Sequence, residues 1–362
     1  MSTTYLYVGT YTRPAPYLAA TNGKGLYVFR FDSTTGELTF ASETTGIDNP
    51  SYLAIDPRQR FLYANTEVWE WPEGLVSAYA IDPASGGLTY LNKQSSLGWL
   101  AAYATVEKSG RWLALVNYMT GNVVLFPLRP DGKLGEAADV AQHSGSGPDP
   151  ARQERPHTHC VVIDPDNRFA IVTDLGIDQI ICYRLDAENG KLVRSGECAL
   201  PPGSGPRHFV FHPSGRFAYV INELSSTLGA LAYNRSSGAL ELLQLVPALP
   251  EGHDIHSSHC ADIQVHPSGR FLYGSNRGHD SIVIYAIDEQ SGRLTYVGHQ
   301  PTGGKTPRNF AIDPSGAFLL AANQDSDNIV TFRVDAHTGK LSPTGFVAQC
   351  PTPACLKFAV LA

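Results

Sequence analysis

The chain has 362 residues, of which 43% are hydrophobic and 17% charged, and its formal net charge is −7. This is enough apolar material for a large buried core, and the lack of any Lys/Arg-rich run argues against a nucleic-acid surface. No apolar stretch approaches the ~20 residues of a membrane helix. The N-terminus, MSTTYLYVGTY, enters an alternating strand pattern at once, so we expect neither a signal peptide nor a membrane partner.

The cysteines are scattered along the chain and form no CxxC motif. They are Cys160, Cys182, Cys198, Cys260, Cys350 and Cys355. We interpret them as small buried apolar residues in a reducing compartment, which predicts a cytoplasmic protein.

A strand, a tight turn of the type D/H-P-x-G/N-R-F and a second strand recur along the chain. The copies occupy 54–67, 106–118 (degenerate), 162–176, 210–223, 265–278 and 311–324. Their marker positions, from Arg60 to Ala317, are separated by 51, 57, 48, 54 and 47 residues. Two further short runs with turn residues follow each copy. Four strands at this spacing predict the blade of a β-propeller.

The two ends of the chain supply one more blade. YLYVGTY, GLYVFRFD and LTFASET match a second, third and fourth strand, and the C-terminal ACLKFAVLA matches a first strand. We therefore expect an all-β, seven-bladed β-propeller with four antiparallel strands per blade. It would form one domain over 1–362, in which 352–362 completes the first blade and closes the ring.

In a propeller, equivalent positions of different blades converge on one axis. The position at the start of the first strand is occupied by Ser51, Ala102, His159, Arg207, Ala261, Arg308 and Ala354. The position after the second strand is occupied by Tyr11, Glu67, Tyr118, Leu175, Glu223, Arg277 and Gln324. Both positions lie at the same mouth of the central channel. Three arginines at one pore of an acidic protein predict an anion-binding site.

Other residues are expected at this mouth. His157 and His259 lie two positions before the first strands, and His208 follows Arg207. Trp69 lies just beyond Glu67 in a loop, where it would either stack on a sugar-like ring or pack on neighbouring loops. The Gly/Pro-rich segment 142–157 is another loop at this face. An Arg207–Glu223 ion pair alone would be a structural feature, but it does not explain the other charged residues in register.

The spacing of one histidine cluster is similar to that of a helical metal site. HDIHSSH places His253, His256 and His259 three residues apart, but this segment lies in a loop and not on a helix. We therefore predict no metal site there.

Several long motifs resemble the seven-bladed lactonase family, which includes 6-phosphogluconolactonases and carboxy-cis,cis-muconate cyclases. They are RPHTHCVVIDPDNRFAIVTDLG, GPRHFVFHPSGRFAYVINELSST, HPSGRFLYGSNRGHD and TPRNFAIDPSGAFLLAANQDSDN. The resemblance covers nearly the whole chain and is strongest from 155 to 340. It implies four catalytic residues, His159, Arg207, Glu223 and Arg277, and no metal or organic cofactor.

The expected activity is hydrolysis of a small anionic sugar lactone, with 6-phosphogluconolactone as the first choice. Either Glu223 or His159 would activate water, while Arg207 and Arg277 would hold the anion and stabilise developing charge. The substrate contacts would come from His157, His208, His259, Arg308, Glu67, Trp69 and Gln324. The alternatives are a muconate-type cyclase, a lactonase for another sugar acid, and a non-catalytic binding propeller. We expect a monomer or a weak homo-oligomer.

Overall fold

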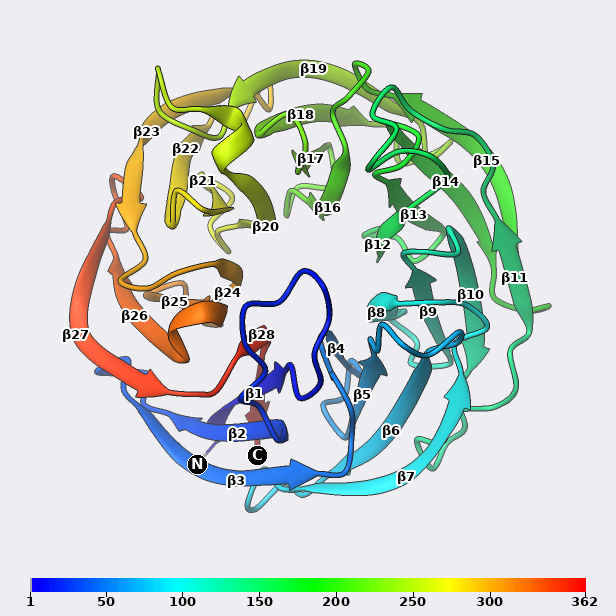
Figure 1. The fold of residues 1–362 in the computed structure, drawn as a ribbon, viewed down its shortest axis with the longest axis vertical. Coiled ribbons are helices and arrows are strands. Elements are labelled where there is room, and N and C mark those ends of the chain that lie inside the picture. Colours follow the sequence, from blue (N-terminus) through cyan, green and yellow to red (C-terminus); the bar gives the residue numbers. More distant parts are fainter. Residues whose placement is uncertain (1) are drawn as a thin grey trace.

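The fold is a ring of four-stranded antiparallel sheets around a central axis (Figure 1). The computed structural model describes residues 2–362, and within them seven such sheets are formed. We number the blades in chain order: blade 1 is β28-β1-β2-β3, blade 2 is β4–β7, and blade 7 is β24–β27. The predicted seven-bladed β-propeller is confirmed.

The first and second strands of each blade lie nearest the axis in Figure 1. The first strands are β28 (Pro353–Leu361), β4 (Leu53–Ile55), β8 (Ala101–Val106), β12 (Thr158–Ile163), β16 (Pro206–Phe211), β20 (His259–Val265) and β24 (Pro307–Ile312). The second strands are β1 (Thr3–Thr10), β5 (Phe61–Thr66), β9 (Trp112–Asn117), β13 (Phe169–Asp174), β17 (Phe217–Asn222), β21 (Phe271–Arg277) and β25 (Phe318–Asn323).

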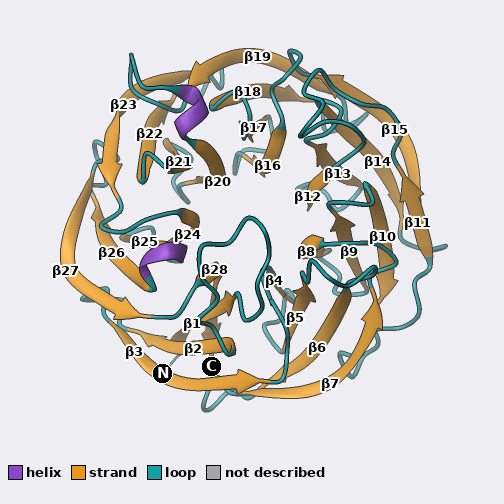
Figure 2. Cartoon of the chain, in the orientation of Figure 1, coloured by secondary structure: helices purple, strands orange, loops and turns teal. Residues whose placement is uncertain are grey.

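The third and fourth strands form the outer part of the ring, and Figure 2 shows how little helix accompanies them. The third strands are β2 (Gly25–Phe31), β6 (Leu75–Ile81), β10 (Asn122–Pro127), β14 (Gln179–Asp186), β18 (Thr227–Tyr233), β22 (Ser281–Ile287) and β26 (Asn328–Val334). The fourth strands are β3 (Leu38–Thr45), β7 (Leu88–Ser95), β11 (Asp139–Gln142), β15 (Lys191–Ala199), β19 (Leu240–Pro247), β23 (Leu294–Pro301) and β27 (Leu341–Gln349). Two 3₁₀ turns, η1 (Ile255–Ser257) and η2 (Gln324–Ser326), lie in the described chain.

The ends of the chain close the ring as predicted. Strand β28 pairs antiparallel with β1, with Tyr5 opposite Ala359 and Tyr7 opposite Lys357. The pairing satisfies the backbone groups that a terminal strand would otherwise expose, so the ring has no open edge at this point. The two ends accordingly lie side by side in Figure 1.

The first residue of the recurring turn accepts hydrogen bonds from the backbone amides of that turn. In blade 4 the carboxylate of Asp164 accepts hydrogen bonds from the backbone amides of Arg168 and Phe169, at 2.5 and 2.8 Å. In blade 5 His212 has the same position, and its Nε2 lies 2.8 Å from the carbonyl oxygen of Gly269 in blade 6. The turn thus fixes its own shape and also contacts the next blade.

Hydrophobic side chains fill the spaces between successive blades. Ile221 of blade 5 and Leu272 of blade 6 belong to one buried cluster, and Tyr63 of blade 2 packs with Leu113 of blade 3 in another. All six cysteines are buried and free. No helix within residues 2–362 has the length and apolar character needed to cross a membrane.

Candidate active site

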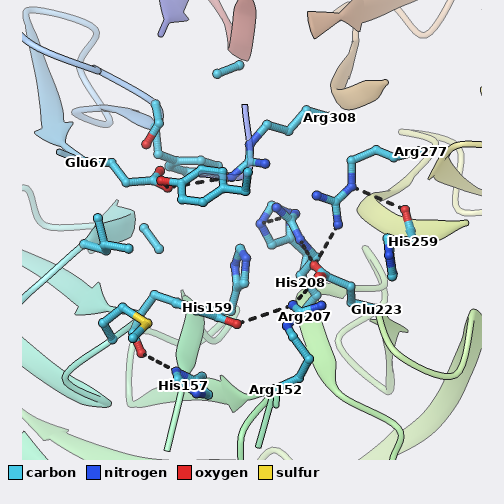
Figure 3. A pocket seen from close by; sticks show the side chains of 18 of the residues that line it. Glu67, Arg152, His157, His159, Arg207, His208, Glu223, His259, Arg277 and Arg308 are labelled. Carbon is cyan, nitrogen blue, oxygen red and sulfur yellow. Dashed lines mark hydrogen bonds and ion pairs between the residues drawn. The ribbon is translucent and has the colours of Figure 1, made fainter. Parts of the chain in front are cut away.

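A cavity of about 510 Å³ opens at the end of the channel where the first strands begin. From the predicted ring at the strand starts, all members except Ala261 line it; they are Ser51, Ala102, His159, Arg207, Arg308 and Ala354. From the second predicted ring Glu67, Tyr118, Glu223 and Arg277 line it as well. Distant parts of the chain therefore meet at one mouth (Figure 3).

The backbone around Gly205 places the central charged pair. Gly205 has a φ of +63°, and a side chain there would collide with Leu224. Its carbonyl oxygen accepts a hydrogen bond of 2.7 Å from the amide of Glu223. The residue before β16 is thereby tied to the residue after β17, and both Arg207 and Glu223 face the cavity.

Glu223 is buried and binds three arginines. Its Oε2 accepts from Arg207 Nε at 2.8 Å and lies 2.7 Å from Arg277 Nη2, while its Oε1 accepts from Arg152 Nη2 at 2.7 Å. Burial alone would raise the pKa of this carboxyl, but the three guanidinium groups outweigh it and hold the pKa well below its usual range. Glu223 is therefore a carboxylate that organises cations, and its basicity is low.

A chain of buried hydrogen bonds extends from Arg207. Its Nη1 donates to the Nε2 of His208 at 3.1 Å, and His208 Nδ1 lies 2.8 Å from Asp262 Oδ1. Because arginine can only donate, His208 Nε2 must be the acceptor and Nδ1 must carry the proton that Asp262 accepts. Burial and the neighbouring Arg207 lower the pKa of His208 to about 4, so the ring is neutral at pH 7.

Arg207 keeps donors for a ligand. Its Nε and Nη1 are engaged by Glu223, His208 and the carbonyl oxygen of Ala261, whereas its Nη2 has no hydrogen-bond partner among residues 2–362. Burial and the nearby Arg277 lower the pKa of Arg207 to about 10, so it stays protonated at neutral pH.

His159 is buried at the cavity wall without a partner. Neither ring nitrogen forms a hydrogen bond to another described residue, and Nδ1 is fully enclosed. Nε2 is therefore the nitrogen that can meet a ligand. Burial and the charge of Arg207 hold the pKa of His159 well below its usual value, so the ring is neutral and can accept a proton at neutral pH.

Arg308 forms a second positive pole. Its guanidinium lies 5.2 Å from the ring centre of Tyr11 and its Nη2 lies 3.8 Å from Glu67 Oε1. Glu67 is already occupied by the hydroxyls of Tyr17 and Tyr11, at 2.7 and 3.1 Å. No donor of Arg308 has a hydrogen-bond acceptor in the part of the chain that the structure describes. A half-buried guanidinium at a cavity, with its hydrogen-bond donors free and only a long contact to a carboxylate, has the properties of an anion site.

The remaining predicted contacts differ in their availability. His157 lines the cavity, but its nitrogens face the Tyr118 carbonyl and the Glu154 carboxylate, each at 3.1 Å. His259 and Trp69 also line the cavity, and the Trp69 ring lies 5.1 Å from that of Trp99. Gln324 does not line it. The chain turns into η2 at this residue, and its side-chain amide donates to Asp325 at 2.9 Å.

Sequence reasoning missed several residues of this site, among them Arg152, Tyr17 and Asp262. Arg152 lies in the irregular loop 142–157, which has no equivalent in other blades, so no register predicted it. Tyr17 lies in a similar loop and lines the cavity. Asp262 could have been found, because it follows Ala261 as His208 follows Arg207, and the two side chains meet between neighbouring first strands.

The three histidines considered for a metal do not form a metal cluster. Within residues 2–362 no group of three or more His, Cys, Asp or Glu side chains is arranged to hold a metal ion. The ring of His253 instead packs against that of His279, with ring centres 4.7 Å apart.

Comparisons with known proteins place the chain in a family. The model described as "Lactonase, 7-bladed beta-propeller" matches residues 5–358. A Bacillus subtilis protein named 6-phosphogluconolactonase is 37% identical over 85% of this chain and 84% of its own, and one of the same name from Formosa agariphila is 40% identical over 85% and 86%. The solved structure of a periplasmic gluconolactonase from Pseudomonas aeruginosa superposes with a TM-score of 0.91, at 33% identity over all of both chains. The chain belongs to the seven-bladed β-propeller lactonase family.

Proposed function

We propose that this protein is an enzyme that hydrolyses a sugar lactone bearing an anionic group, with 6-phosphogluconolactone as the substrate. The observation that carries the proposal is a cavity of about 510 Å³ faced by two groups that have no hydrogen-bond partner among the described residues. They are the half-buried guanidinium of Arg308, which contacts Glu67 Oε1 only at 3.8 Å, and the buried ring of His159. A volume of this order suits a small ligand. The relatives named 6-phosphogluconolactonase support the choice of substrate.

His159 is the better general base of the two residues that the sequence left open. Glu223 is surrounded by three arginines, which depress its pKa and occupy both of its oxygens. His159 has a free nitrogen and is unprotonated at neutral pH. A bound anion would offset the positive field of the arginines and raise the basicity of His159 when substrate is present. The same ring, once protonated, would return the proton to the leaving alkoxide.

Arg207 and Arg277 would stabilise the negative charge that develops on the carbonyl oxygen. Both are held by Glu223, so their donors are oriented before the substrate binds and need not reorganise when negative charge develops on the carbonyl oxygen. Glu223 then acts as a positioning residue for these two groups.

Arg308 would hold the anionic group of the substrate. Trp69, His259 and Glu67 lie around the same cavity and would contact the sugar. His157 would contribute only a ring surface, because both of its nitrogens are occupied.

A lactone panel compared between wild type and Arg308→Met tests this assignment. Wild type should prefer a lactone with a 6-phosphate over its unphosphorylated form. Arg308→Met should lose roughly tenfold to a hundredfold in kcat/KM for the phosphorylated lactone, because a charge-assisted pair is lost, and little for the other. Equal losses for both lactones would contradict the role of Arg308. Cyclisation of a carboxymuconate without lactone hydrolysis would contradict the proposed function itself.

The compartment, domain organisation and assembly belong to the same proposal. Six free, buried cysteines support a reducing compartment, so we place the protein in the cytoplasm. The closed ring supports a single domain, and we propose a monomer or a weak homo-oligomer. Cell fractionation, a single unfolding transition and light scattering would test these three points.

A further inference from the structure

A second cavity, of about 350 Å³, lies away from the mouth, between the turns of blades 2 and 3. Its lining comes from the turn before β5, the turn before β9 and the segment after β10. Four arginines line it, namely Arg58, Arg60, Arg111 and Arg129. Because β4 and β5 run from the mouth to this turn and back, the cavity opens on the opposite face of the ring.

These four arginines have no acidic partners. None forms a salt bridge to a described residue, and Asp56 is the only carboxylate in the lining. Asp56 is occupied by the backbone amides of Arg60 and Phe61, at 2.6 and 2.7 Å. The adjacent Asp131 lies 3.5 Å from Lys133 Nζ. The cavity wall therefore carries a net charge of +3 in a chain whose overall charge is −7.

The equivalent junction between blades 4 and 5 shows that this charge is not required by the fold. At that junction Asp166 takes the turn position that Arg58 occupies in blade 2, and it pairs with both Arg168 and Arg235. Two more arginines of the Arg60 register that lie outside this cavity are also engaged: Arg216 donates to the carbonyl oxygen of Glu289, at 2.5 Å, and Arg270 to that of Ala336. Arg60 has no such acceptor among the described residues.

Blade 3 also has an arginine at a position where the other blades have an acid or an asparagine. After the third strand the other blades carry an acid or asparagine that closes the turn, as Asp288 does in blade 6 by accepting the amide of Ser291 at 2.8 Å. Blade 3 has Arg129 at this position. Two capping or pairing groups have thus been replaced by arginine around one cavity.

We propose that this cavity between blades 2 and 3 is a binding site for a small phosphorylated anion. Guanidinium groups bind phosphate oxygens in bidentate geometry, and several around one cavity favour a ligand with more than one negative charge. The Phe61 ring at the same wall lies 5.0 Å from the guanidinium carbon of Arg60 and supports that group beside the cavity. The site is separate from the mouth and does not depend on the lactonase activity.

Calorimetric titration with pyrophosphate tests the site. Wild type should bind it, and Arg58→Asp, which restores the blade 4 residue, should raise the Kd roughly tenfold or more. Arg129→Gln should weaken binding in the same direction. Two variants serve as controls: Arg216→Gln in the same register of blade 5, and Arg308→Met at the mouth. Both should retain the binding seen in wild type.

The outcomes separate the two faces of the ring. Binding that survives in Arg58→Asp and Arg129→Gln, or that disappears in Arg308→Met, would place the anion elsewhere and overturn the proposal. So would the lack of any binding by wild type at millimolar pyrophosphate. Melting temperatures show whether each variant is folded, and lactone turnover by Arg58→Asp should match wild type because Arg58 lies far from the mouth.

Discussion

Buried histidines at the two faces of the ring differ in their hydrogen bonding. At the turn end, His212 and His266 have both ring nitrogens within 2.8 Å of partners, in their own turn and in the next blade. At the mouth, His159 is equally buried but has no partner for either nitrogen among the described residues. A buried polar group left unsatisfied is costly, so its retention points to a ligand and not to the fold.

Carboxylates show the same contrast. Asp164 at the turn end accepts amides from its own turn. Glu223 at the mouth joins Arg152, Arg207 and Arg277, which come from three separate parts of the chain. The polar groups of the turn end are therefore satisfied within one or two blades, while Glu223 at the mouth joins side chains from the loop 142–157, blade 5 and blade 6.

The largest expected effect is on turnover, and it should separate a histidine of the mouth from a histidine of the turn end. His159→Asn should lower kcat on a lactone by roughly 10²–10⁴-fold, the range for loss of a general base, with little change in stability. His212→Asn should leave kcat unchanged and lower the free energy of unfolding by about 1–3 kcal/mol, because a buried partner becomes unsatisfied. Turnover assays and urea unfolding of both variants measure this. Near-normal turnover by His159→Asn would remove the proposed base.

The sequence predicted the repeated turns and strands well and the irregular loops at the mouth poorly. Blade number and ring closure could be predicted because each turn is local and repeats its own chemistry. Arg207, Glu223 and Arg277 could be placed at one mouth because they lie in register on repeated strands. Arg152 could not, since its loop has no repeat, and Gln324 has the right register but a local 3₁₀ turn directs it elsewhere.

Removing the charge of Glu223 sharpens the comparison of carboxylates. Glu223→Gln keeps the side-chain shape but leaves three guanidinium groups without their counter-charge, so the free energy of unfolding should fall by about 3–5 kcal/mol. Turnover should fall as well, by roughly 10²-fold, because Arg207 and Arg277 lose their orientation. Asp166→Asn, at the exposed pair of the turn face, is the matched control and should change neither quantity much. Equal losses of stability in the two variants would mean that the buried Glu223 cluster stabilises the fold no more than an exposed ion pair does.

The pH dependence of stability gives the smallest effect and tests His208. Its folded pKa is about 4, below the ordinary value of 6.5. Between these values the unfolded chain binds a proton that the folded chain does not, so the free energy of unfolding should fall as pH drops from 6.5 towards 4. The depressed pKa values of Glu223 and Asp262 add losses only below the ordinary carboxyl values of 4.5 and 3.8.

The part of this window above pH 4.5 therefore separates the histidine contribution from that of the acids. His208→Gln should flatten the decline in that window, and urea unfolding at several pH values measures the slope. His159 contributes to the same slope, since its pKa is also depressed, so the decline should be reduced in His208→Gln and not abolished. An unchanged slope would mean that His208 takes up its proton as readily in the folded protein as in the unfolded chain. The Arg207–His208–Asp262 chain would then have a different proton arrangement, because a doubly protonated ring cannot accept from Arg207.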